Sequence, residues 1–195
     1  MKKFELTENY KICFRHKLFQ IRALVTIEGV VKAGETGGYI EKEENLSQFG
    51  NSWVSGHACV FGNARVVGNS CVTGNARVSG NTFLAGNSRV TENARVSGNA
   101  LVTGNSRVTE NACVSGNAIV TGNACVSGNA IVTGNSRVTG NARVYGHALV
   151  YENAFVTGYS SVCGDAEVFG NACVSCDEFV FGGAIFSGDK IVSDN

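Results

Sequence analysis

Proline is absent from the 195 residues of the chain, and methionine and tryptophan occur once each. Without proline or a Gly-X-Y period, the sequence is neither collagen-like nor a proline-rich disordered segment. No apolar run approaches the ~20 residues of a membrane-spanning helix, and the first residues lack the apolar stretch of a signal peptide. These absences favour a globular protein of the cytoplasm.

The chain also lacks an excess of charge of either sign. Lys and Arg together number 16, and so do Asp and Glu, which leaves a formal net charge of zero. A balanced charge gives no reason to expect an acidic membrane surface or nucleic acid as a partner. We therefore expect neither.

Cysteine is plentiful, with eight residues, but its arrangement does not favour a metal site. Most of the cysteines stand in repeat positions that Arg, Ile or Phe occupy elsewhere. Cys173 and Cys176 form the one CxxC motif, and no second pair is present in the sequence to complete a zinc site. Without an export signal we expect reduced thiols rather than a disulfide framework, and we predict no metal.

A repeat of six residues begins at Trp53 and reads Val-Thr/Ser-Gly-Asn-Ala-Xaa. Its aliphatic position recurs 24 times without insertion from Val54 to Val192, and 22 of these positions are Val. A β-branched side chain suits an extended strand and is expected to point inward. The small Ala or Ser two positions earlier fits a tight corner, and Gly-Asn supplies the turn. Asparagines stacked between successive coils can form hydrogen-bonded ladders.

Three such hexads make one triangular coil of 18 residues, and 24 hexads make eight coils. The sequence therefore predicts an all-β fold, a parallel β-helix over residues 51–195. Residues 1–50 lack the repeat and are expected to form a β-rich cap, because the end of a β-helix exposes unpaired backbone and core. Short strands are expected at 4–6, 10–14 and 18–24, with a hairpin turn at 15–17.

The hexad repeat resembles that of the left-handed β-helix superfamily to which lipid A acyltransferases and bacterial O-acetyltransferases belong. The resemblance covers about three quarters of the chain and implies left-handed crossovers, which the period alone does not determine. A period of six argues against a pentapeptide-repeat prism, and a right-handed solenoid has no comparable six-residue signature. The stretch VKAGETGGYIEKEENLSQFGNSWV (31–54) also resembles the start of uncharacterised YdcK-type β-helix proteins of bacteria and their prophages. That resemblance suggests a phage or mobile-element origin.

In that superfamily a histidine typically acts as general base in a cleft between subunits, and long loops that interrupt the coils help to bind the acyl carrier. The candidates here are His147 and His57, which occupy the Asn position of the turn. They are 90 residues apart, hence five coils or about 24 Å, too far to act together in one chain. No loop interrupts the repeat. We favour a protein without catalysis or cofactor, and the alternative is an acyl- or acetyltransferase that uses acetyl-CoA or another acyl-CoA.

Every eighteenth position lies on the same face of a triangular coil, so the outward positions can be written as rows. One row is mainly apolar and reads Arg65, Phe83, Leu101, Ile119, Arg137, Phe155, Cys173, Ile191. A large apolar stripe on a surface usually marks an interface. We predict that its apolar residues form the contact of a homotrimer, the assembly that the superfamily resemblance implies. These residues are Phe83, Leu101, Ile119, Phe155 and Ile191.

The other two faces carry arginines in adjacent coils. They are Arg77 and Arg95 on one face, and Arg89 and Arg107 on the other. Guanidinium groups in regular rows suit a phosphate or another anion, so these four residues are predicted to bind an anionic small ligand such as a nucleotide. The alternative is that they keep a flat sheet solvated and discourage aggregation. Glu92 and Glu110, at the corner between the two faces, are expected as ion-pair partners.

The preferred hypothesis is a non-catalytic, homo-oligomeric β-helix that acts as a binding, structural or host-interaction protein of a phage or mobile element. Its partners would be further copies of itself, another protein or an anionic small molecule. The reasons are the uninterrupted repeat, the apolar stripe and the lack of a credible catalytic constellation.

Overall fold

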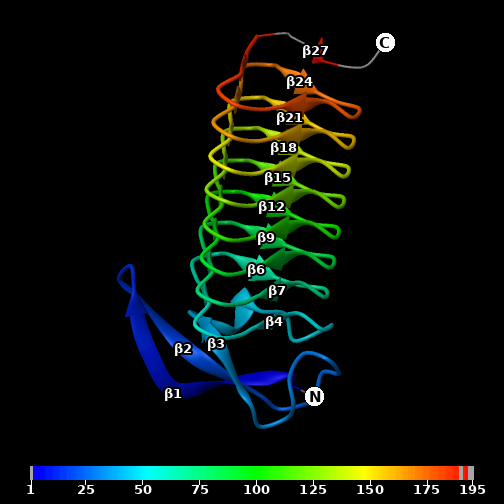
Figure 1. The fold of residues 1–195 in the computed structure, drawn as a ribbon. Helices are drawn as coiled ribbons and strands as arrows, with labels where there is room; N and C mark the ends of the chain where they lie inside the picture. Colours follow the sequence, from blue (N-terminus) through cyan, green and yellow to red (C-terminus); the bar gives the residue numbers. More distant parts are fainter. Residues whose placement is uncertain (1, 189–190, 193–195) are drawn as a thin grey trace.

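The computed structural model describes residues 2–188 and 191–192. In this part of the chain, 27 strands and one three-residue 3₁₀ helix, η1 (Glu43–Asn45), build an all-β structure. Figure 1 shows the coils stacked in a single column, with the N-terminal strands at its base and the C-terminus at the opposite end. The predicted parallel β-helix of about eight coils is confirmed.

The coils consist of two-residue strands that fall into three parallel sheets. Sheet 1 continues the N-terminal strands and contains β5 (Cys59–Val60), β8 (Arg77–Val78), β11 (Arg95–Val96), β14 (Cys113–Val114), β17 (Ile131–Val132), β20 (Leu149–Val150), β23 (Glu167–Val168) and β26 (Ile185–Phe186). Sheet 2 contains β4 (Trp53–Val54), β7 (Cys71–Val72), β10 (Arg89–Val90), β13 (Arg107–Val108), β16 (Cys125–Val126), β19 (Arg143–Val144), β22 (Ser161–Val162) and β25 (Phe179–Val180). Sheet 3 contains β6 (Arg65–Val66), β9 (Phe83–Leu84), β12 (Leu101–Val102), β15 (Ile119–Val120), β18 (Arg137–Val138), β21 (Phe155–Val156), β24 (Cys173–Val174) and β27 (Ile191–Val192). Each coil contributes one strand to every sheet.

The pairing register confirms the 18-residue coil. Leu101 lies opposite Ile119, and Val102 lies opposite Val120, in neighbouring coils. The inward aliphatic side chains from Val54 to Val174 are fully buried, and small corner residues such as Ala112 are buried with them. The core is therefore a continuous stack of one aliphatic side chain per strand.

The corners show why the repeat needs Gly-Asn. Gly98 adopts a left-handed backbone conformation with φ of 72°, and a Cβ atom there would lie 2.6 Å from the carbonyl oxygen of Gly116 in the next coil. The following asparagines connect the coils, since Asn81 Nδ2 donates to Asn99 Oδ1 at 2.8 Å. Ladders of this kind run along all three corners. The predicted asparagine ladders are confirmed.

The N-terminal segment joins sheet 1 directly. Strands β1 (Phe4–Cys13) and β2 (His16–Ala23) form an antiparallel hairpin, and β3 (Thr36–Ile40) pairs with β2 on one side and in parallel with β5 on the other. The hairpin turn lies at Phe14 and Arg15, with φ values of 49° and 70°, and not at residues 15–17 as the sequence suggested. The prediction was wrong because a bulky phenylalanine rarely adopts positive φ. Residues 4–13 also form one strand with a register irregularity instead of two strands.

The base of the column is filled by side chains from the N-terminal segment. Phe4 packs edge-on against Trp53, with 6.5 Å between ring centroids, and Ile21 and Ile40 are fully buried in the same core. The Lys3 ammonium donates to the carbonyl oxygen of Ser52 at 2.8 Å and to its hydroxyl at 3.1 Å. Burial lowers the pKa of Lys3 to about 8. The N-terminal strands therefore cover core that the first coil would otherwise expose.

Candidate binding surfaces

Sheet 3 carries the predicted apolar row. Phe83, Leu101, Ile119 and Phe155 lie on β9, β12, β15 and β21, in one line along the column. All four are half-buried rather than exposed, because residues in register above and below cover part of each. Ile191 belongs to β27, and its side chain lies outside the described residues. The spacing thus gives the line of the row along sheet 3.

The surface beside this row is flat, and hydroxyl groups on it are paired. Thr103 and Thr121 share a hydrogen bond of 2.9 Å, and Thr139 donates to Thr157 at 2.8 Å. No carboxylate stands in the described strands of sheet 3. Paired hydroxyls lose little when water is removed, so the desolvation cost of covering sheet 3 comes chiefly from Arg65 and Arg137, which stand in the same row.

The four predicted arginines are divided between two faces. Arg77 lies opposite Arg95 in sheet 1, and Arg89 lies opposite Arg107 in sheet 2. They therefore form two in-register pairs and not one site. Like charges directly opposite one another destabilise a sheet, and an anion bound between the two would relieve that repulsion.

The expected ion pairs at the corner between sheets 1 and 2 are not formed. Across the described residues, ion pairs join Lys2 with Glu43, His16 with Glu41, and Arg22 with Glu5. Glu92 and Glu110 occupy the left-handed turn position, with φ of 62° and 61°, and neither pairs with an arginine. The prediction was wrong because sharing a corner does not bring a turn side chain within reach of a strand side chain.

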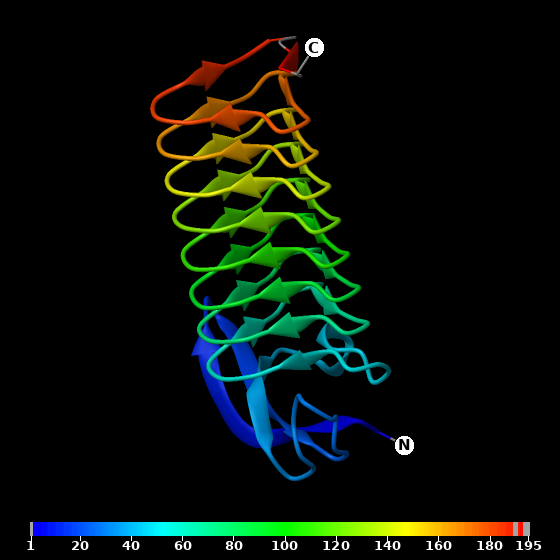
Figure 2. The ribbon, with the colours of Figure 1, turned by 45° about the vertical axis from the view of Figure 1, so that its right-hand side comes forward.

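A cavity of about 500 Å³ lies between the N-terminal hairpin and sheet 1. It is lined by Phe14, Phe61, Arg77, Ser79, Arg95, Val96, Ser97 and Cys113. The rings of Phe14 and Phe61 stack with 6.2 Å between centroids, and the Arg77 guanidinium carbon lies 5.1 Å from the Phe14 centroid. Figure 2 shows the hairpin rising beside the lowest coils. This cavity combines one predicted arginine pair with an aromatic wall.

Sequence reasoning missed the aromatic wall, although one signal for it was present. Phe61 stands in the position that Ser79 and Ser97 occupy in the next two coils. This ring departs from the small hydroxyl residues of the next coils, although Tyr151 and Phe169 stand in the same row farther along the column. The hairpin that covers Phe61 is outside the repeat, so the period gives no information about it.

Polar contacts hold the hairpin against sheet 1. His16 Nδ1 lies 2.8 Å from one Glu41 carboxylate oxygen, and the backbone N–H of Gly62 donates to the other at 2.6 Å. Lys11 Nζ donates to the carbonyl oxygen of His57 at 2.9 Å. Burial alone would raise the pKa of the Glu41 carboxyl, but the His16 and Gly62 hydrogen bonds outweigh it and hold that pKa below its ordinary value. Glu41 therefore connects the hairpin to the first complete coil.

Replacing Glu41 by glutamine should loosen the hairpin while the coils stay folded. The amide keeps the shape but loses the charge that strengthens both hydrogen bonds. Because the pair is partly exposed, we expect a loss of about 0.5–1 kcal/mol. Since the carboxyl pKa lies below the ordinary 4.5, this stabilisation is fully present above that pH and is lost as pH falls below it.

Amide hydrogen exchange measures this change. Amides of β1 and β2 should exchange several-fold faster in Glu41→Gln at neutral pH, whereas those of β12 and β15 should not change. Hairpin exchange that is identical in the two proteins would contradict the role assigned to Glu41.

A wider groove of about 740 Å³ follows sheet 2. Arg107 and Arg143 lie in its wall with Tyr145, so one of the four predicted arginines reaches it. Along its edge Asn105 donates to Asn123, and Asn123 donates to Asn141, within one ladder. Burial raises the pKa of the Cys125 thiol in the same wall, which disfavours the nucleophilic thiolate. The groove offers cations and hydroxyls but no activated group.

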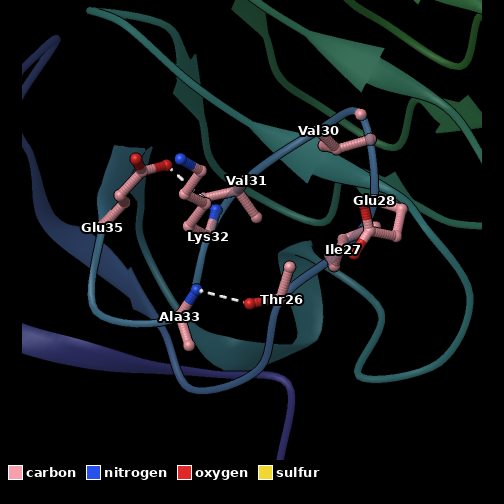
Figure 3. A pocket seen from close by; sticks show the side chains of 9 residues that line it. Thr26, Ile27, Glu28, Val30, Val31, Lys32, Ala33 and Glu35 are labelled. Atoms are coloured by element: carbon pink, nitrogen blue, oxygen red, sulfur yellow. Dashed lines mark hydrogen bonds between the residues drawn. The ribbon is translucent and has the colours of Figure 1, made fainter.

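A third pocket, of about 460 Å³, is lined by residues of the loop at 26–35 and is open to solvent. Figure 3 shows that its polar groups close the loop upon itself. The backbone N–H of Ala33 donates to Thr26 Oγ1 at 3.1 Å, and that of Lys32 donates to Glu35 Oε2 at 2.9 Å. These hydrogen bonds hold the loop in its conformation.

The two candidate histidines lie far apart on one corner. His147 continues an asparagine ladder, with its Nε2 3.5 Å from Asn129 Nδ2. The His57 carbonyl accepts the hydrogen bond from Lys11. The one histidine–carboxylate pair among the described residues is His16 with Glu41, which holds the hairpin. The structure therefore does not bring His147 or His57 together with an acid.

The described residues show no sign of a metal centre or of a membrane-spanning helix. They contain no group of three or more His, Cys, Asp or Glu side chains placed to hold a metal ion. None of the helices in that part has the length and apolarity needed to cross a bilayer. All eight cysteines are free thiols.

The three parallel sheets and the uninterrupted coils define a β-solenoid repeat protein. Residues 94–110 match the family model described as the YdcK beta solenoid repeat. The match spans about one coil, and the repeat of this chain is similar to that family there. No curated protein matches the chain.

Proposed function

We propose that this protein is a non-catalytic, self-associating β-solenoid that acts by binding through its flat faces. Sheet 3 is its self-association surface, and the assembly is a homotrimer. The observation that carries the proposal is the line of Phe83, Leu101, Ile119 and Phe155 on one face of a rigid column. Such a particle suits a structural or host-interaction protein of a phage or mobile element. Eight free thiols support a reducing compartment such as the cytoplasm.

Three features of sheet 3 support a second copy of the chain as its partner. Its described strands hold no carboxylate, and Arg65 and Arg137 are their charged side chains, so four of the row's outward residues present apolar groups. Its threonine hydroxyls are satisfied within the chain. Its backbone is fixed by hydrogen bonds between coils, such as Leu101 N to Ala118 O at 2.9 Å. A flat, pre-formed surface loses little conformational freedom when it associates.

Light scattering of the purified protein tests this assembly. At a concentration of about 10 µM we expect three times the mass of one chain, which corresponds to a tight homo-oligomer. Leu101→Glu and Ile119→Glu should each give monomers, because a buried unpaired carboxylate at the centre of an apolar contact costs several kcal/mol. Ile131→Glu is the matched control, since Ile131 is an exposed isoleucine in the same kind of strand on sheet 1. It should leave the trimer intact.

The mass of the wild-type assembly also distinguishes a monomer, a twofold dimer and a threefold trimer. A monomeric wild-type protein would overturn the proposal. A dimer broken by the same two variants would retain sheet 3 but replace the threefold arrangement by an antiparallel twofold one. In that register the reversed row would set Leu101 against Ile119 and Phe83 against Arg137, so each cation would meet a ring.

A further inference from the structure

We propose that the cavity between the hairpin tip and sheet 1 binds an anion that carries an aromatic ring. Arg77 and Arg95 hold the anionic group, and Phe14 contacts the ring. The site is independent of the self-association surface, because it lies on sheet 1 whereas the apolar row lies on sheet 3. Its volume of about 500 Å³ lies within the range of small-molecule sites.

The charge of the cavity favours an anion. Arg77 and Arg95 are neighbours in register, and the lining contains no acidic side chain. Neither arginine belongs to an ion pair among the described residues. Two adjacent guanidinium groups present several N–H donors on one side, which matches the oxygens of a phosphate or carboxylate. The hydroxyls of Ser79 and Ser97 lie in the same wall and add further donors.

The hairpin tip favours a ring. The Phe14 side chain is 65% exposed, although its backbone has a φ of 49°, which bulky residues rarely adopt. The two-residue loop between Cys13 and His16 requires positive φ at both of its residues, so the turn itself sets this backbone conformation and turns the Phe14 ring toward sheet 1. Its neighbours there are Phe61 and Arg77, which fix the position of the Phe14 ring. An exposed ring held in place offers a ligand ring a stacking surface.

A second reading of the Arg77–Phe14 contact is that it only anchors the hairpin. Arg95 distinguishes the two readings, because it lines the cavity one coil beyond Arg77. Anchoring of the hairpin does not need Arg95, whereas binding of an anion does. The control is Arg89, which stands in the same kind of in-register pair on sheet 2.

Isothermal titration calorimetry with phenyl phosphate tests the site. Phenyl phosphate should bind at one site per chain, and inorganic phosphate and benzyl alcohol should each bind at least about tenfold more weakly. Arg95→Ala should weaken binding of phenyl phosphate by about tenfold or more, since it removes a charge-assisted contact. Arg89→Ala should leave the Kd unchanged. Phe14→Ser should weaken binding of phenyl phosphate but not that of inorganic phosphate.

Several results would overturn the proposal. If phenyl phosphate does not bind at millimolar concentration, the cavity is not a binding site for an aromatic anion. Equal weakening by Arg95→Ala and Arg89→Ala would show attraction by general surface charge. Equal affinity for phenyl phosphate and inorganic phosphate would show that Phe14 does not contact the aromatic ring of the ligand. Circular dichroism of Arg95→Ala should match the wild type, so that lost binding is not lost folding.

Discussion

Val126→Asp should unfold the central coils, whereas Cys125→Asp, one residue away, should be tolerated. Val126 is fully buried on β16 and lies between Val108 and Val144 of the neighbouring coils. A carboxylate there would be surrounded by aliphatic groups, with no donor in the stack. We expect a loss of at least about 4 kcal/mol in the free energy of unfolding, because a buried unpaired charge is among the costliest substitutions.

The neighbouring position has the opposite environment. Cys125 is half-buried on the outer side of the same strand, and Arg107 and Arg143 lie opposite it in the adjoining coils. Aspartate at this position would stand between two cations, so we expect a change within about 1 kcal/mol, in the stabilising direction. Urea unfolding followed by circular dichroism measures both variants. Equal destabilisation by the two would contradict the inward and outward assignment of every strand in the column.

The alternation of one outward and one inward residue in each strand explains how much of the fold could be predicted from the sequence. One inward residue per strand and one turn per hexad fix the strand length and the 18-residue coil. Hence the pairing of Leu101 with Ile119 followed from counting alone. The period does not determine handedness, which was expected from a resemblance. The period also does not reveal how far neighbouring coils cover an outward side chain, such as the half-buried Leu101.

The N-terminal hairpin could not be predicted in the same way. Its turn places Phe14 at positive φ, and the contacts that support this conformation come from Phe61 and Arg77, which are distant in sequence. Local propensity favours other residues for such a turn. The arginine pair of the candidate site followed from spacing, but the wall that turns it into a cavity depends on tertiary contacts. The regular part of the site was therefore predictable, and the irregular part was not.

Gly98→Ala should destabilise the column by about 2–4 kcal/mol, and this cost should exceed that of Gly29→Ala. Both glycines have a φ of 72°, so the backbone strain of an added side chain, about 1–2 kcal/mol, is the same at both positions. They differ in what the new methyl group meets. A Cβ at Gly29 has no heavy atom within 4 Å, whereas a Cβ at Gly98 would lie 2.6 Å from the oxygen and 2.8 Å from the nitrogen of Gly116.

The difference between the two variants isolates the cost of separating stacked coils. Glu92 and Glu110 show that the column can accept side chains at this turn position, since they are one coil apart and both have positive φ. The clash at Gly98 should therefore be relieved by a local shift, which is why we expect a few kcal/mol and not complete unfolding. Thermal and urea denaturation of the two variants measure the difference. Equal costs would mean that turn glycines are required for their backbone angles alone, and that close stacking of the corners does not constrain the repeat.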